Sequence, residues 1–171
     1  QAAYGVTTGV GSQKDFKVSS EAVIRYNQRL ITAHATRVPG PTLKPETVRA
    51  ALIYMVNAFG CGFSGVSAAL VRLLLNKIES DEMPEIDASG SVGASDLVPL
   101  AQIAHWLLSS DEARSSGLPG AKEAISLINS NAISLAVGAE QLVETERLLS
   151  TFDLTAAVSI EGFRGNPWAV S

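Results

Sequence analysis

The sequence has one cysteine and two histidines among its 171 residues. A single cysteine excludes an intrachain disulfide and is typical of proteins from reducing compartments, so we expect a cytoplasmic location. So few sulfur and imidazole ligands also argue against a zinc site, and we expect no metal. No apolar run reaches the roughly 18 residues that span a bilayer, and no signal peptide is visible, so we expect no membrane association.

Aromatic residues are also scarce, at 6% of the chain, although hydrophobic residues make up 46%. The core must therefore come from Leu, Ile, Val and Ala, a composition that favours helices over disorder. The net charge of −4 indicates no basic surface for nucleic acid. The length suits one domain with a buried core. Because the chain begins without Met and stops in the segment PWAVS, we expect it to be a piece of a longer protein.

Apolar residues recur at helical spacing along the chain, and no segment alternates at the two-residue period of a strand. We predict helices over residues 21–35, 45–59, 64–78, 97–108, 121–129 and 130–150, and a last helix that begins at Asp153. Residues 79–95 and 109–120 are predicted loops. Leucines at 135, 142 and 149 recur every seven residues, as in a bundle seam, and indicate partners beyond this chain. The predicted class is an all-α helical bundle.

Short motifs along nearly the whole chain match one family in the expected order. They are YGVTTGVG at 4–11, GFSG at 62–65, GSVGASDLVPL at 90–100, KEAISLIN at 122–129 and SIEGFRG at 159–165. Together they resemble the motifs of aromatic amino-acid ammonia-lyases and aminomutases, which read YG(V/I)(N/T)TGFG, GxSG, GSVGASGDLxPL, KEGLALIN and SLEALRG. Val10 replaces the family's Phe, and Ala124 replaces its Gly.

The resemblance implies the N-terminal and central part of the ammonia-lyase (fumarase/aspartase-like) fold. Residues 1–171 are then a single helical domain of a longer lyase chain. Residues 1–18 form an inner catalytic loop, and residues 19–171 form a helical core with a cofactor loop at 79–96. The family's sites form where several subunits of a homotetramer meet, and their substrate is a small amino acid. The connection at 109–121 is shorter than usual, and the later substrate-binding Tyr and Arg are absent.

The family's cofactor is a 4-methylidene-imidazole-5-one (MIO), an electrophile made when an Ala-Ser-Gly tripeptide cyclises and loses two waters. Ala94 and Ser95 match its first two residues, and Asp96 stands where the cyclisation needs Gly. Two interpretations stay open. Either the sequence omits a glycine that belongs to a crosslinked tripeptide, or Asp96 is truly third and cyclisation is impaired.

The resemblance also assigns roles to residues outside the tripeptide. The substrate amine adds to the methylidene carbon of Ser95, and Tyr4 acts as the base that removes a β-proton. Because tyrosine is a weak base, the site must stabilise its phenolate. Asn129 matches the residue that hydrogen-bonds near cofactor and substrate; alternatively, it caps the helix expected from Ser130.

Three further residues are expected at the site. His34, together with Ala33, resembles the Ser-His pair with which histidine-specific lyases and some tyrosine aminomutases read the substrate side chain. The alternative is a structural histidine that the helix dipole favours. Gly5 and Leu97 are expected there by position only.

These assignments lead to three functional hypotheses. The first is an MIO-dependent ammonia-lyase that converts Phe, Tyr or His into an α,β-unsaturated acid. The second is an MIO-dependent aminomutase that makes a β-amino acid. The third is a truncated, non-catalytic homologue that acts as an assembly module.

Overall fold

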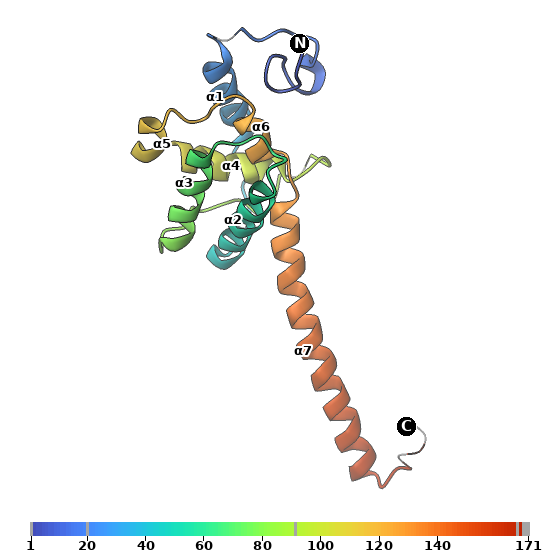
Figure 1. Ribbon diagram of the computed structural model, residues 1–171. Helices are drawn as coiled ribbons and strands as arrows, with labels where there is room; N and C mark the ends of the chain where they lie inside the picture. The colour runs from blue at the N-terminus through green and yellow to red at the C-terminus, as the bar shows by residue number, and fades with distance from the viewer. Residues whose placement is uncertain (1, 20, 91, 167, 169–171) are drawn as a thin grey trace. The chain divides into compact units, whose positions relative to one another are not determined.

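The computed structural model describes residues 2–19, 21–90, 92–166 and 168. The regular secondary structure of these residues consists of helices joined by loops (Figure 1). Apart from isolated bridges between Thr8 and Lys17 and between Thr42 and Asp87, these residues form no β-structure. The predicted all-α class is confirmed. The elements are a 3-10 turn at Gly11–Gln13 and helices α1 (Val23–His34), α2 (Pro45–Gly60), α3 (Ala68–Glu79), α4 (Leu97–Leu108), α5 (Asp111–Ser115), α6 (Glu123–Ile128) and α7 (Ala132–Gly162).

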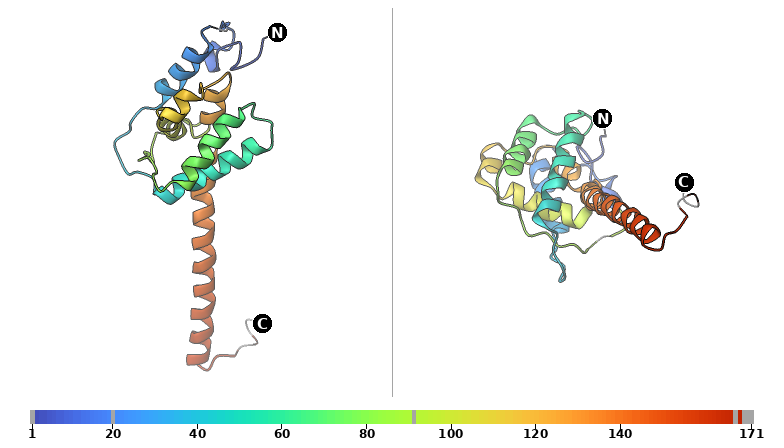
Figure 2. Two further views of the ribbon diagram at one scale, coloured as in Figure 1. Left: turned by 60° about the vertical axis from the view of Figure 1, so that its left-hand side comes forward. Right: turned by 90° about the horizontal axis from the view of Figure 1, so that it is seen from below.

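The chain divides into two compact units, Gln1–Ala136 and Val137–Ser171. The core of the first unit is built around α4, which contacts α1, α3, α5 and α6, while α2 packs on α3 (Figure 2). α4 is buried because it is apolar nearly all round. The largest fully buried aliphatic side chains come mainly from α2, α3, α4 and α6: Leu52, Leu70, Leu73, Leu74, Leu100, Ile103, Leu107, Leu127 and Ile128.

The starts of α2, α3 and α5 follow local signals in the sequence. α2 begins at Pro45, whose missing N–H and fixed φ suit a first turn. α3 begins at Ala68, later than predicted, because the Ser67 hydroxyl accepts the Leu70 N–H at 3.2 Å and caps it there. Residues 109–120 were expected to be a loop, but they contain α5, whose cap is the Ser110 hydroxyl. Ser20, which directly precedes the first predicted helix, lies outside the described residues.

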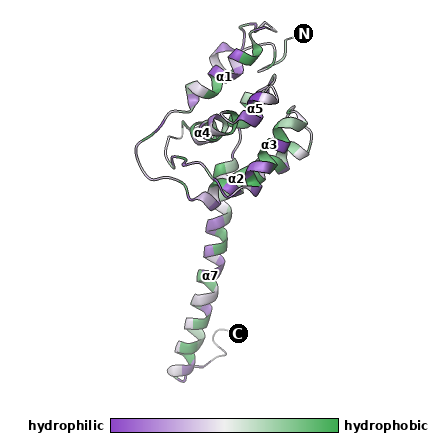
Figure 3. Ribbon diagram, turned by 90° about the vertical axis from the view of Figure 1, so that its left-hand side faces the viewer, coloured by the Kyte–Doolittle hydropathy of each residue, from purple (hydrophilic) through white to green (hydrophobic). Residues whose placement is uncertain are grey.

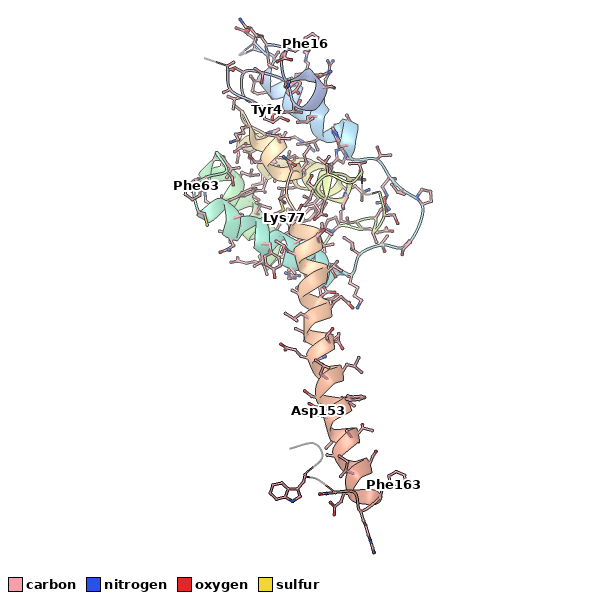
Figure 4. All side chains as sticks on the ribbon, turned by 90° about the vertical axis from the view of Figure 1, so that its right-hand side faces the viewer. Tyr4, Phe16, Phe63, Lys77, Asp153 and Phe163 are labelled. Carbon is pink, nitrogen blue, oxygen red and sulfur yellow. The ribbon has the colours of Figure 1, made fainter. Side chains whose placement is uncertain are left out.

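The prediction of a helix break at Asp153 is wrong, since α7 runs without interruption from Ala132 to Gly162. Asp153 lies exposed along this helix (Figure 4). Neither Gly nor Pro occurs between residues 139 and 161, so nothing in the backbone forces the helix to stop.

Apolar residues recur along α7 (Figure 3), and many of their side chains are exposed. Leu135, Leu142 and Leu149, the predicted seam, are 53%, 61% and 58% exposed. No helix among the described residues combines the length and apolarity that crossing a bilayer requires. The cytoplasmic location and the single domain over 1–171 stay predictions.

Candidate active site

The N-terminal loop folds back on itself and is attached to α1. Within the loop, the Gly9 N–H donates to the Phe16 carbonyl and the Val18 N–H donates to the Thr7 carbonyl, both at 2.9 Å. The Val10 N–H donates to the Tyr26 hydroxyl of α1, also at 2.9 Å. These bonds hold the loop against α1.

Gly5 lets this loop lie directly against α6. Its φ of +67° is left-handed, and a Cβ there would stand 3.0 Å from Cγ2 of Ile125. Any other residue would be both strained and crowded at this point. Gly5 is buried beside α6 rather than in the cavity described below, so its role is to seat the loop that carries Tyr4.

Tyr4 is 53% exposed, and the rest of its surface is covered by neighbouring chain (Figure 4). Its hydroxyl oxygen accepts the Gly11 N–H at 2.9 Å. This bond fixes the position of the hydroxyl against the backbone of its own loop.

A cavity of about 720 Å³ lies between the N-terminal loop, α1, the start of α4 and α6. It brings together most of the residues singled out from the sequence, although they come from segments far apart in the chain. They are Tyr4, His34, Ala94, Leu97 and Asn129. Gly5, Ser95 and Asp96 are not among the lining residues.

His34 is the last residue of α1 and is half-buried. Its Nδ1 lies 2.8 Å from the Leu30 carbonyl oxygen. Because a carbonyl oxygen only accepts, Nδ1 is the donor in this contact, and in the singly protonated ring Nε2 is the acceptor. His34 therefore has a helix-anchored nitrogen and a second one available to a ligand.

Asn129 is the residue that ends α6, and its side chain has no hydrogen-bond partner among the described residues. The alternative that it caps a helix at Ser130 is wrong, since α7 begins at Ala132 and the Ser130 hydroxyl accepts the Ala132 N–H at 3.4 Å. Tyr4 and Asn129 also line a second cavity of about 310 Å³. Asn129 thus borders both cavities.

Tyr26 and Arg29 line the large cavity and were missed in the sequence. They lie on the same face of α1 as Ala33, because residues at i, i+3 and i+7 share one side of a helix. Neither residue lies in a motif, so their place on the face of Ala33 is the only signal that could have indicated them. Arg29 has no ion pair among the described residues, so its guanidinium is available to a carboxylate.

The loop before Ala94 is fixed by Asp87, which is only 2% exposed. One carboxylate oxygen accepts the Val38 N–H at 2.7 Å and the Gln102 amide at 2.8 Å. The other lies 2.9 Å from the Arg37 guanidinium. The Val38 hydrogen bond is the largest cause of a lowered pKa of Asp87; the bond from Gln102 and the charge of Arg37 add to it, and desolvation opposes them. This network joins the 79–96 loop to α4.

The tripeptide expected to form MIO has an unusual geometry. Ser95 has a left-handed φ of +49°, and its hydroxyl oxygen is buried without a partner among the described residues. The Asp96 N–H donates to the Ser130 carbonyl at 2.9 Å. The Asp96 carboxylate accepts the N–H of Ser134 at 2.9 Å and its hydroxyl at 2.6 Å. Asp96 stands at the N-cap position of α4, but its side chain binds the first turn of α7 instead.

These residues do not fit the MIO group. Cyclisation needs the amide nitrogen of the third residue to attack the Ala94 carbonyl, and that of Asp96 is committed to Ser130. Asp96 also carries a Cβ where glycine allows the tight turn. Ser95, whose Cβ would become the electrophilic carbon, does not line the cavity.

Comparison with known proteins agrees with this architecture. The family described as aromatic amino acid lyase matches residues 1–171. The chain belongs to the aromatic amino acid lyase family. A curated relative, histidine ammonia-lyase from Caldanaerobacter subterraneus subsp. tengcongensis, is 33% identical over 180 residues; the match covers 95% of this chain and 35% of the relative.

Two solved structures share the fold over nearly the whole chain. The ergothioneine-degrading enzyme ergothionase from Treponema denticola has a TM-score of 0.86 at 27% identity and covers 100% of this chain and 38% of that one. Phenylalanine aminomutase from Pantoea agglomerans has a TM-score of 0.83 at 26% identity and covers 97% of this chain and 35% of that one. The chain therefore matches the N-terminal part of ammonia-lyase structures and spans little more than a third of their length. Enzymes of this family use the MIO cofactor.

Proposed function

We propose that this chain supplies part of the active site of a carbon–nitrogen lyase. The enzyme eliminates the α-amine from an amino acid with an imidazole or other aromatic side chain and releases an α,β-unsaturated acid. The observation that carries this proposal is the convergence of Tyr4, His34 and Asn129 on one cavity. The similarity to histidine ammonia-lyase supports an imidazole substrate.

Each residue has a chemical task in this reaction. Tyr4, with its oxygen bonded to the Gly11 N–H, removes the β-proton. Nε2 of His34 accepts a hydrogen bond from an N–H of the substrate's imidazole ring, because its Nδ1 is held by Leu30. Arg29 binds the substrate carboxylate, and the Asn129 amide orients the amine. The MIO cofactor is not part of the proposal, because Asp96 does not fit it.

The whole enzyme is a homotetramer with a small-molecule amino-acid substrate. The exposed leucine seam of α7 supports such an assembly, because a large apolar surface that is open to solvent usually marks a contact with another protein chain. We expect the remaining lining of the site to come from other parts of the enzyme, because this chain spans 35% of the histidine ammonia-lyase it matches.

The test is a product assay on the complete gene product. The protein is incubated with imidazole, phenol and phenyl amino acids and with their N-methylated derivatives. An unsaturated acid, seen by its near-UV absorbance, together with an equal amount of released amine is the expected result. No unsaturated acid from any substrate would exclude the lyase; if no β-amino acid forms either, the assembly module is left.

An aminomutase is the second candidate, favoured by the similarity to phenylalanine aminomutase. The same assay separates it from a lyase, because a mutase converts the substrate into its β-amino acid without net release of amine.

A further inference from the structure

A third cavity, of about 430 Å³, lies between the N-terminal loop and α1 and is called the loop pocket below. Its charged lining residues are all cations: Lys17 from the loop, and Arg25 and Arg29 from α1. We propose that the loop pocket binds a small organic anion, a phosphate or carboxylate on a flat apolar body, and that the bound anion draws Arg29 away from the large cavity. The binding stands on its own, whereas its effect on turnover rests on the proposed lyase function.

The cations of the loop pocket have no counter-charge of their own. None of them forms an ion pair among the described residues. Asp15 and Glu21 are close in the sequence, but no Asp or Glu is among the described lining residues. Arg25 and Arg29 are four positions apart on α1, a spacing at which like charges repel. An anion between them removes this repulsion and accepts hydrogen bonds from both guanidinium groups.

The loop pocket also offers apolar surface. The ring of Phe16, which is 72% exposed, lines it together with Tyr26 (Figure 4). Val18 and Ala22 add aliphatic carbon to the lining. A bare inorganic ion gains nothing from these groups, but a flat ring can pack on them. The lining therefore favours an organic anion over a free one.

Hydrogen bonds within the chain hold the two walls of the loop pocket together. The Gly9 N–H donates to the Phe16 carbonyl, and the Val10 N–H donates to the Tyr26 hydroxyl, both at 2.9 Å. The first bond closes the loop that carries Phe16, and the second ties this loop to α1. Because the walls are held without a ligand, little ordering of the chain opposes binding.

Tyr26 and Arg29 connect the loop pocket to the large cavity, since both residues line both cavities. A guanidinium group that is drawn to an anion in the loop pocket is less well placed for a carboxylate in the large cavity. The anion therefore weakens substrate binding without touching Tyr4 or Asn129, which do not line the loop pocket. We expect a higher KM and an unchanged kcat.

The first test is calorimetric titration of the complete gene product with phenyl phosphate, benzoate, inorganic phosphate and benzyl alcohol. We expect phenyl phosphate or benzoate to bind, and the tighter of the two identifies the anionic group. Inorganic phosphate should bind more weakly because it lacks the ring, and benzyl alcohol should give no binding heat because it lacks the charge. If neither organic anion binds, or if either reference compound binds as tightly as they do, the proposed ligand class is overturned.

Two matched double variants locate the binding. Lys17→Gln/Arg25→Gln removes two cations that do not line the large cavity and should weaken phenyl phosphate binding by about tenfold or more. Lys14→Gln/Arg72→Gln removes the same charges outside both cavities and should keep the wild-type affinity. Circular dichroism checks that both variants fold. Wild-type affinity in the Lys17/Arg25 variant would overturn the site, because the anion would then be bound elsewhere.

The second test measures elimination with and without phenyl phosphate. The anion should raise KM of the wild type at constant kcat, and it should have little effect on the Lys17→Gln/Arg25→Gln variant. An equal rise in KM in this variant would mean that phenyl phosphate competes in the large cavity, and would overturn the link through Arg29. If no substrate is turned over at all, the lyase is excluded, while the titrations still decide whether the loop pocket binds an anion.

Discussion

At the scale of single residues, Ser95 combines a left-handed backbone with a buried, unpartnered hydroxyl. A left-handed φ costs a non-glycine residue about 1–2 kcal/mol, whereas glycine adopts it freely but loses more entropy on folding. We therefore expect Ser95→Gly to be more stable than Ser95→Ala by about 1 kcal/mol. Urea unfolding of both variants measures the difference. Equal stability would mean that the backbone at Ser95 is unstrained.

Asp87 makes the protein sensitive to acid. Its pKa is lowered in the folded state from the ordinary value of 3.8, chiefly by the Val38 N–H. A depressed carboxyl pKa stabilises the fold above the unfolded pKa, and this stability is lost as the pH falls through the folded pKa. We expect Asp87→Asn to be less stable than the wild type at pH 7 and to show a weaker pH dependence below pH 3.8. Parallel unfolding curves from pH 7 to pH 2 check this, with Asp81→Asn as the matched control on the same loop.

At the scale of elements, Asp96 links the start of α4 to the first turn of α7. Its carboxylate satisfies the Ser134 N–H, which has no partner within its own helix. Asp96→Ala should destabilise the protein by about 1 kcal/mol, as loss of a helix cap does, and Asp96→Asn should cost less because it keeps an acceptor. Thermal unfolding of the two variants provides the comparison. An Asp96→Ala variant as stable as the wild type would contradict the capping role.

The sequence identified the helices better than their ends. Pro45 and the apolar face of residues 48–59 predicted α2 correctly, because proline and a buried stripe are local signals. The start of α3 depends on which of several serines caps it, and α5 is too short to show periodicity. Asp153 was wrongly expected to start a helix, because capping residues are also tolerated on the exposed face of a long one.

The sequence predicted the site residues that resemble a family motif, but not those outside the motifs. Tyr4, His34 and Asn129 could be named from the resemblance, and all of them line one cavity. Arg29 lies outside every motif, and its position in the cavity is known only once α1 is placed against the N-terminal loop. The bond from Asp96 to Ser130 joins residues 34 positions apart, and no local pattern indicates it.

At the scale of the whole molecule, α7 exposes the seam that the heptad spacing predicted. Leu142 and Leu149 are more than half exposed, so we expect them to be covered by partner helices in the complete enzyme. The double variant Leu142→Glu/Leu149→Glu should lower the oligomeric state measured by light scattering. Thr151→Glu, on the opposite side of the same helix, is the control for added charge and should change little. A double variant that still forms the wild-type oligomer would place the interface elsewhere.

The most direct measurement is the rate of elimination by the Tyr4→Phe variant of the complete gene product. This change removes only the hydroxyl that accepts the Gly11 N–H and is proposed to take the β-proton. The kcat for formation of unsaturated acid should fall by about 10²- to 10⁴-fold with little change in KM. Phe16→Leu, on the same loop but outside the large cavity, should keep the wild-type rate. An unchanged kcat for Tyr4→Phe would contradict the role of this cavity as the catalytic site.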